Sequence, residues 1–88
     1  MTSNRYEIII HRRAADFINA LKKTYKNKIK FALEKFRENP FSHPYKKIKG
    51  KQRLYRVRIG RYRMLYEVNQ LEKKIVIYKI DERGDIYK

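Results

Sequence analysis

Apolar and polar residues alternate between Leu54 and Val68, and the alternation is interrupted once, at Gly60–Arg61. This period of two predicts a pair of β-strands, and a glycine at the first of two central positions predicts a type II′ hairpin turn. The resulting register places Arg58 directly opposite Arg63. One face of the hairpin is then expected to carry Tyr55, Val57, Ile59, Tyr62, Met64 and Tyr66. The other face is expected to carry Leu54, Arg56, Arg58, Arg63, Leu65 and Glu67.

The segment before the hairpin is predicted to form a short strand followed by two helices. A short apolar run over residues 6–10 predicts a strand. Its buried face is expected to hold Tyr6, Ile8 and Ile10. From Arg12 the apolar residues recur at helical spacing, and Asn39–Pro40 ends the pattern because the residue before proline avoids the helical region. A break near Thr24 to Asn27 divides this segment into an antiparallel hairpin of two helices.

The remaining segments complete an α+β fold. Phe41 to Gln52 is predicted to be a basic loop, and Asn69 to Glu72 a turn. Lys73 to Ile80 is apolar on both faces, which is typical of a central strand. The order is therefore an N-terminal strand, a two-helix hairpin and an antiparallel meander of three strands, in one domain over residues 1–88. We expect the helices to cover one face of the sheet and the arginines to lie on the other.

The charge of the chain indicates a polyanionic partner. The 88 residues include 24 Lys and Arg but only 9 Asp and Glu, which gives a net charge of +15. Such a charge opposes compaction and favours binding to a phosphate backbone or to an acidic protein. The chain has no cysteine, which excludes disulfides and thiolate chemistry. We expect a cytoplasmic protein that does not bind membranes, because no apolar stretch approaches the length of a membrane span.

Several kinds of catalytic or cofactor site find little support. The serines and histidines that a hydrolytic triad would need are Ser3, Ser42, His11 and His43, none of them in a suitable arrangement. Asp81, Glu82 and Asp85 could hold a metal ion, but Arg83 lies among them and salt bridges are the simpler interpretation. The three glycines are too scattered for a phosphate-binding loop. We therefore expect neither a metal nor another cofactor.

The basic side chains of the hairpin form the candidate site. Like charges directly across a strand pair are destabilising, so an arginine opposite an arginine is a local cost that folding does not explain. The proposed site arginines are Arg56, Arg58, Arg63 and Arg83. Tyr87, in an otherwise polar tail, is a candidate for stacking on a base. The basic loop adds candidate RNA-binding residues: Lys46, Lys47, Lys49 and Lys51.

These motifs, in this order, resemble the RelE/ParE superfamily of bacterial and archaeal toxins, and most of all its archaeal RelE members. The resemblance rests on Tyr-Arg-Val-Arg at 55–58, Gly-x-Tyr-Arg at 60–63, the run 65–68 and the ending Arg83-Gly-Asp-Ile-Tyr87. It implies a type II toxin that enters the ribosomal decoding site and cuts the bound messenger without a metal. It also implies an acidic, RelB-like antitoxin, and contact with operator DNA only as the toxin–antitoxin complex.

The resemblance also assigns roles to particular residues. Arg56 and Arg58 stand where the family has basic residues that contact the scissile phosphate and its neighbours. Arg63 stands at the arginine that stabilises the phosphate, Arg83 at an arginine of the C-terminal motif and Tyr87 at the base-stacking aromatic. Glu82 stands where many relatives carry a histidine, which makes it a candidate acid or base.

Two alternative functions remain open. A ParE-like toxin would inhibit DNA gyrase by binding, with no cleavage chemistry, because the same fold serves both activities. A plain basic nucleic-acid-binding module would explain the charge but not the combination of tyrosine and arginines. Arg63, Arg83 and Tyr87 favour the ribonuclease.

Overall fold

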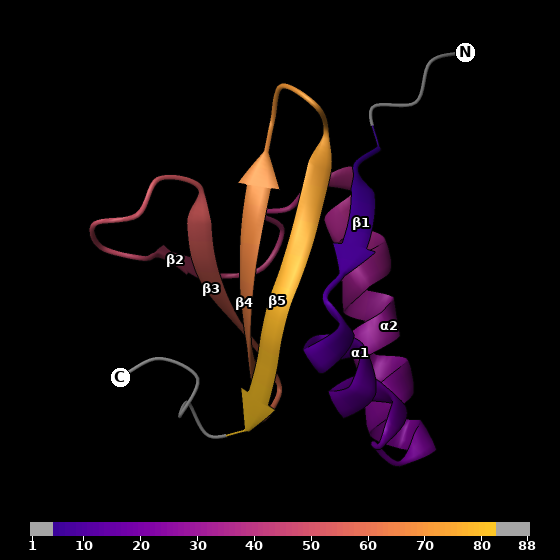
Figure 1. Cartoon of the computed structure of the whole chain (residues 1–88). Helices are drawn as coiled ribbons and strands as arrows, with labels where there is room; N and C mark the ends of the chain where they lie inside the picture. Colours follow the sequence, from indigo (N-terminus) through magenta and orange to yellow (C-terminus); the bar gives the residue numbers. More distant parts are fainter. Residues whose placement is uncertain (1–4, 83–88) are drawn as a thin grey trace.

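The structure is a computed structural model that describes residues 5–82, and it places two helices against one face of a five-stranded sheet (Figure 1). The elements are β1 (Glu7–Ile10), α1 (Arg12–Asn19), α2 (Lys23–Glu38), β2 (Tyr45–Lys47), β3 (Leu54–Ile59), β4 (Tyr62–Asn69) and β5 (Lys74–Glu82). The strand order is β1-β5-β4-β3-β2. β1 pairs with β5 in parallel and the other pairs are antiparallel. The predicted α+β class is confirmed, with β5 in the interior of the sheet as its apolar faces indicated.

The predicted hairpin between β3 and β4 is present in the predicted register. Ile59 pairs with Tyr62, and Arg58 pairs with Arg63. Gly60, the first central residue of the turn, has a φ of 59°. Arg61, the second, does not have a positive φ, because Arg53 and Lys73 are the non-glycine residues of the described chain that do. A positive φ at the first central position alone is the signature of a type II′ turn, whose twist matches that of the flanking strands.

Three details of the sequence prediction are corrected. The segment predicted as a basic loop contains the short edge strand β2, which pairs with β3 over Tyr45–Lys47. The break between the helices falls at residues 20–22 rather than 24–27, because Tyr25 belongs to the apolar stripe of α2 and packs against Tyr62. Ile10 was expected on the buried face of its strand, but it is 36% exposed because β1 lies at the edge of the sheet.

Tyr66 lies at the centre of the core between the sheet and α2. Its side chain is fully buried and its ring centroid lies 5.2 Å from that of Phe36. Its hydroxyl donates a hydrogen bond of 3.0 Å to the backbone carbonyl of Pro40, just beyond the end of α2. A buried hydroxyl needs such a partner, so this bond fixes the exit of α2 on the sheet.

We predict that Tyr66→Phe lowers the free energy of unfolding by about 0.5–1.5 kcal/mol, because it removes one buried hydrogen bond while keeping the ring. Burial raises the pKa of Tyr66 above its ordinary value of 10.0. The protonated hydroxyl therefore makes its full contribution to the free energy of unfolding below pH 10. This contribution is lost as the pH rises towards the pKa of the folded state. The difference between wild type and Tyr66→Phe should shrink above pH 10, as measured by urea unfolding. A difference that is independent of pH would contradict this role of the hydroxyl.

Candidate functional site

The face of the sheet that the helices leave open carries the basic side chains of three adjacent strands. In the observed register Lys46 of β2 pairs with Arg56 of β3, and Arg58 of β3 pairs with Arg63 of β4. Their neighbours Val57 and Met64 are buried towards the helices, so the alternation of the strands turns these four side chains outward. We call Lys46, Arg56, Arg58 and Arg63 the arginine face.

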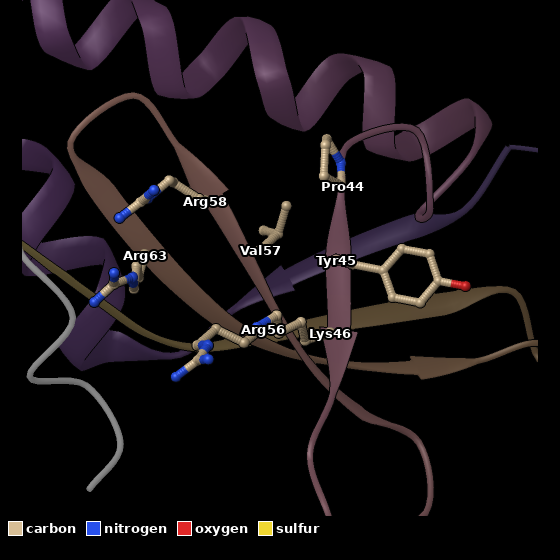
Figure 2. Close-up of a pocket in the computed structure, with 7 residues that line it drawn as sticks. All are labelled: Pro44, Tyr45, Lys46, Arg56, Val57, Arg58 and Arg63. Atoms are coloured by element: carbon tan, nitrogen blue, oxygen red, sulfur yellow. The ribbon is translucent and has the colours of Figure 1, made fainter.

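The arginine face borders a cleft of about 290 Å³. The cleft is lined by Pro44, Tyr45, Lys46, Arg56, Val57, Arg58 and Arg63. In Figure 2 the guanidinium groups of the three arginines point to the same side of the hairpin, whereas the ring of Tyr45 points away from them. The cleft therefore presents several hydrogen-bond donors from adjacent positions, which is an arrangement that suits a phosphate group.

The side chains of the arginine face form no ion pair with an acidic residue among residues 5–82. The ion pairs of this part of the chain are Arg5–Glu38, Arg37–Glu34, Arg61–Glu82 and Lys74–Glu72. Arg58 lies directly opposite Arg63, and like charges in such a pair cost about 0.2–1 kcal/mol. An anion bound in the cleft would offset this repulsion, which makes the arginine face a ready site for a polyanion.

A bulge in the pairing of β4 with β5 decides which acidic residue faces the arginines. The register shifts between Leu65 and Tyr66, where Leu65 pairs with Lys79 and Tyr66 pairs with Ile77. Beyond the bulge, Asp81 is opposite Arg63 in the strand register and therefore lies on the open side of the sheet. One oxygen of its carboxylate accepts a hydrogen bond of 2.7 Å from the backbone amide of Glu82.

Glu82, the candidate acid or base, lies on the other side of the sheet. It pairs with Tyr62, whose buried ring packs edge-on against Phe17 of α1 and Tyr25 of α2. The carboxylate of Glu82 forms a 2.6 Å ion pair with Arg61. The structure therefore separates Glu82 from the arginine face by the thickness of the sheet.

Arg61 is a residue that the sequence did not single out. Arg61 lies in the turn of the hairpin and forms an ion pair with the carboxylate of Glu82. Its Nη1 donates a 3.3 Å hydrogen bond to the hydroxyl of Tyr25. Its guanidinium carbon also lies 5.5 Å from the centroid of the Tyr25 ring. The charge of Glu82 is the main cause of a raised pKa of Arg61. These contacts tie the tip of the hairpin to α2 and to the end of β5, and only the tertiary structure reveals them.

The other candidate residues fall in different places. Lys47 pairs with Tyr55, which faces the helix side of the sheet, so Lys47 points away from the arginine face. Lys49 and Lys51 are exposed in the segment between β2 and β3. Arg83 and Tyr87 lie outside the residues that the structure describes.

The open face continues beyond the arginines into an apolar region, which the sequence analysis did not interpret. Leu54, Leu65 and Tyr78 border a shallow hollow of about 560 Å³ there. The hydroxyl of Tyr78 donates a 2.6 Å hydrogen bond to the carboxylate of Glu67, and this bond raises the pKa of Tyr78. The open face thus has a cationic end and an apolar end.

Residues 5–82 contain no group of three or more His, Cys, Asp or Glu side chains that could hold a metal ion. Neither described helix is both long enough and apolar enough to span a bilayer.

Comparison with protein families connects this fold to toxins. The model of the family described as the ParE toxin of type II toxin–antitoxin system, parDE, matches residues 8–87. The curated relative RelE1 of Methanocaldococcus jannaschii is 32% identical over 87 residues, which cover 96% of this chain and 97% of the relative.

Solved structures of toxin–antitoxin complexes contain chains of similar fold. The archaeal RelE–RelB complex from Pyrococcus horikoshii OT3 contains a chain with a TM-score of 0.80 and 28% identity, and the match covers 92% of this chain and 98% of that one. The RelB–RelE antitoxin–toxin complex from Methanococcus jannaschii gives a TM-score of 0.70 at 25% identity, with 90% and 94% covered.

Proposed function

Because this chain belongs to the ParE toxin family of type II toxin–antitoxin systems, within the RelE/ParE superfamily, we propose that it cuts messenger RNA bound to the ribosome. The observation that carries the proposal is the arginine face, where Arg58 and Arg63 stand opposite each other and neither forms an ion pair within the described chain. A toxin that acts only by binding gyrase does not need this concentration of phosphate-binding groups in one small cleft. The proposal therefore favours an endoribonuclease and inhibition of translation.

The proposed reaction is an attack within the RNA chain. The 2′-hydroxyl of one nucleotide gives its proton to water as its oxygen attacks the adjacent phosphorus. The bond from phosphorus to the 5′-oxygen breaks, and the leaving 5′-oxygen takes a proton from water, so that a 2′,3′-cyclic phosphate and a 5′-hydroxyl are formed. Negative charge accumulates on the phosphate in the transition state, and preorganised donors stabilise it there. We assign this role to Arg63 with Arg58, and contacts to the scissile phosphate and its neighbours to Arg56 and Lys46.

The ribosome is assigned the task of positioning the messenger. Arginines, with a pKa above about 12, are poor general bases, so the arginine face supplies charge stabilisation rather than proton transfer. Glu82 would have to break its ion pair with Arg61 to reach the substrate, and we build the proposal without it. A large part of the rate enhancement then comes from the ribosome, which holds the 2′-hydroxyl in line with the leaving oxygen. We extend the proposal to Arg83 for the phosphate and to Tyr87 for base stacking on the ground of family resemblance alone.

The partner proposed for this toxin is an acidic, RelB-like antitoxin. Chains of similar fold occur with RelB in the structures from Pyrococcus horikoshii and Methanococcus jannaschii. A net charge of +15 favours a negatively charged partner, which would also stabilise the domain by mass action. We propose that the toxin acts in the cytoplasm and that it contacts operator DNA only within the toxin–antitoxin complex.

A second candidate function is inhibition of DNA gyrase. The description of the matching family model favours it, because that description names the ParE toxin. In this case the arginine face would bind its target without cleavage.

We predict that the purified protein cuts messenger on programmed ribosomes and leaves the same RNA intact without them. The reason is that the arginine face supplies charge stabilisation and no acid–base pair, so the rate depends on the ribosome to hold the 2′-hydroxyl in line with the leaving oxygen. Primer extension on both substrates measures the difference. A gyrase supercoiling assay at the same protein concentration serves as the comparison.

Three outcomes would contradict the proposal. Intact messenger on ribosomes together with inhibited gyrase would support the ParE-like function. Equal cleavage of naked and ribosome-bound RNA would show that the ribosome has no positioning role. Cleavage of naked RNA that EDTA abolishes would indicate a metal-dependent nuclease.

We further predict that Lys46→Ala and Lys47→Ala differ, although both lower the net charge by one and lie next to each other in β2. Lys46→Ala should lower kcat/KM on programmed ribosomes about tenfold, which corresponds to about 1.4 kcal/mol for a lost phosphate contact. Lys47→Ala should stay within about twofold, because its side chain lies on the opposite side of the sheet. Equal losses in the two variants would mean that overall charge, and not the arginine face, governs activity.

A further inference from the structure

The tip of the β3–β4 hairpin carries three arginines within the six residues 58–63. Arg58 and Arg63 lie opposite each other on the open face, and Arg61 lies between them in the turn. The like charges of Arg58 and Arg63 repel each other. This repulsion acts at one end of the sheet, where strand pairing stops and local opening costs least. The orientation of the two site arginines therefore depends on what holds the tip in place.

The side chain of Arg61 connects this tip to two other elements. Its Nε lies 2.6 Å from a carboxylate oxygen of Glu82, at the end of β5. Its Nη1 donates a 3.3 Å hydrogen bond to the hydroxyl of Tyr25 in α2, and its guanidinium carbon lies 5.5 Å from the centroid of that ring. Glu82 is opposite Tyr62 in the strand register, and Tyr62 directly precedes Arg63. Arg61 therefore joins the turn to β5 and α2 beside a site arginine.

Global stability gives little reason for these contacts. The side chains of Arg61 and Glu82 are 55% and 38% exposed, and exposed ion pairs contribute little to the free energy of unfolding. Among the ion pairs within residues 5–82, however, this one has the shortest N–O distance, 2.6 Å against 3.5–3.7 Å in the others. Its place next to the arginine face points to a local role, which is to limit movement of the tip.

We propose that Arg61 is a positioning residue of the arginine face. Its ion pair with Glu82 and its contacts with Tyr25 hold the tip of the hairpin against β5 and α2. Arg58 and Arg63 thereby keep the orientation in which they face the phosphate group of the substrate RNA. This inference rests on the proposed function, because it assumes that these two arginines stabilise the transition state of RNA cleavage.

A positioning role differs from direct contact with the RNA. Glu82 and Tyr25 both lie on the helix side of the sheet, so Arg61 acts on the open face through the backbone of the hairpin. A displacement of charge-stabilising groups by about 1 Å can lower a rate by about 10². Binding of the RNA is spread over many basic side chains and is much less sensitive to the orientation of two of them. Loss of the contacts of Arg61 should therefore lower kcat and leave KM nearly unchanged.

The test compares single and double variants of the full chain on programmed ribosomes. Arg61→Ala and Glu82→Gln should each lower kcat about tenfold, with KM within about twofold of wild type. The double variant with Arg61→Glu and Glu82→Arg re-forms the ion pair in the opposite direction and should recover kcat to within about threefold. Arg37→Ala and Glu34→Gln are the matched controls, because they break an exposed ion pair of α2 with the same changes in charge. Both controls should keep wild-type kcat and KM.

A second measurement follows the tip in the free protein and needs no activity. The NMR order parameters of the backbone amides of Arg58 and Arg63 should fall from about 0.85, the value of a rigid backbone, towards about 0.6 in Arg61→Ala and in Glu82→Gln. The double variant should restore them, and Arg37→Ala should leave them unchanged. The circular dichroism spectrum of every variant should match that of the wild type, which separates a mobile tip from a lost fold.

Three results would overturn the inference. Arg61→Ala could match Arg37→Ala in kcat, or the order parameters at the tip could stay at wild-type values. A loss in Arg61→Ala that Glu82→Gln does not share and the double variant does not restore would show that Arg61 contacts the RNA itself. Failure of the proposed function would look different, because a wild-type protein that cuts no messenger on ribosomes could still show the predicted changes in the order parameters.

Discussion

The register of the β3–β4 hairpin is the constraint on which both the core and the candidate site depend. Side chains alternate across the sheet with a period of two, so a slip of one residue would exchange the two faces of β3. Arg56 and Arg58 would then enter the core, while Val57 and Ile59 would face water. The turn at Gly60, with its φ of 59°, sets the register, and the contacts of Arg61 with Glu82 and Tyr25 hold the tip of the hairpin against the helices.

The same register produces the cost that points to function. With the apolar side chains buried, Arg58 and Arg63 have to meet on the open face, where no carboxylate of the described chain forms an ion pair with either of them. The remainder of the fold follows the usual rules, with paired strands, a packed core and a hydrogen bond for the buried hydroxyl of Tyr66. A local conflict in an otherwise consistent structure is typical of a functional site. A bound phosphate group would remove the conflict, which is the physical link between the fold and the proposed cleavage of RNA.

Much of this arrangement could be predicted from the sequence, because a strict alternation and one glycine are local signals. The alternation identified the buried face of the hairpin and the opposition of Arg58 and Arg63. The strand β2 could not be predicted, because its three residues are exposed and follow a proline. The side of the sheet on which Glu82 lies also could not be predicted. Uninterrupted alternation from the buried Ile77 would place Glu82 on the open face, whereas the structure places it on the helix side. The bulge opposite Leu65 and Tyr66 reverses this placement and brings Asp81 beside Arg63 instead.

The most direct test of the account measures stability and cleavage on the same variant, Arg63→Ala, beside Arg12→Ala, which removes an exposed arginine of α1. The account predicts that Arg63→Ala keeps the unfolding free energy of the wild type or raises it by a few tenths of a kcal/mol, because a like-charge pair is relieved. It also predicts that single-turnover cleavage on programmed ribosomes falls by about 10²–10³, the usual effect of removing one preorganised charge-stabilising group. Arg12→Ala should leave both quantities nearly unchanged. Full activity of Arg63→Ala, or a loss of stability as large as that of a core substitution, would contradict the claim that the hairpin holds its arginines unpaired for catalysis.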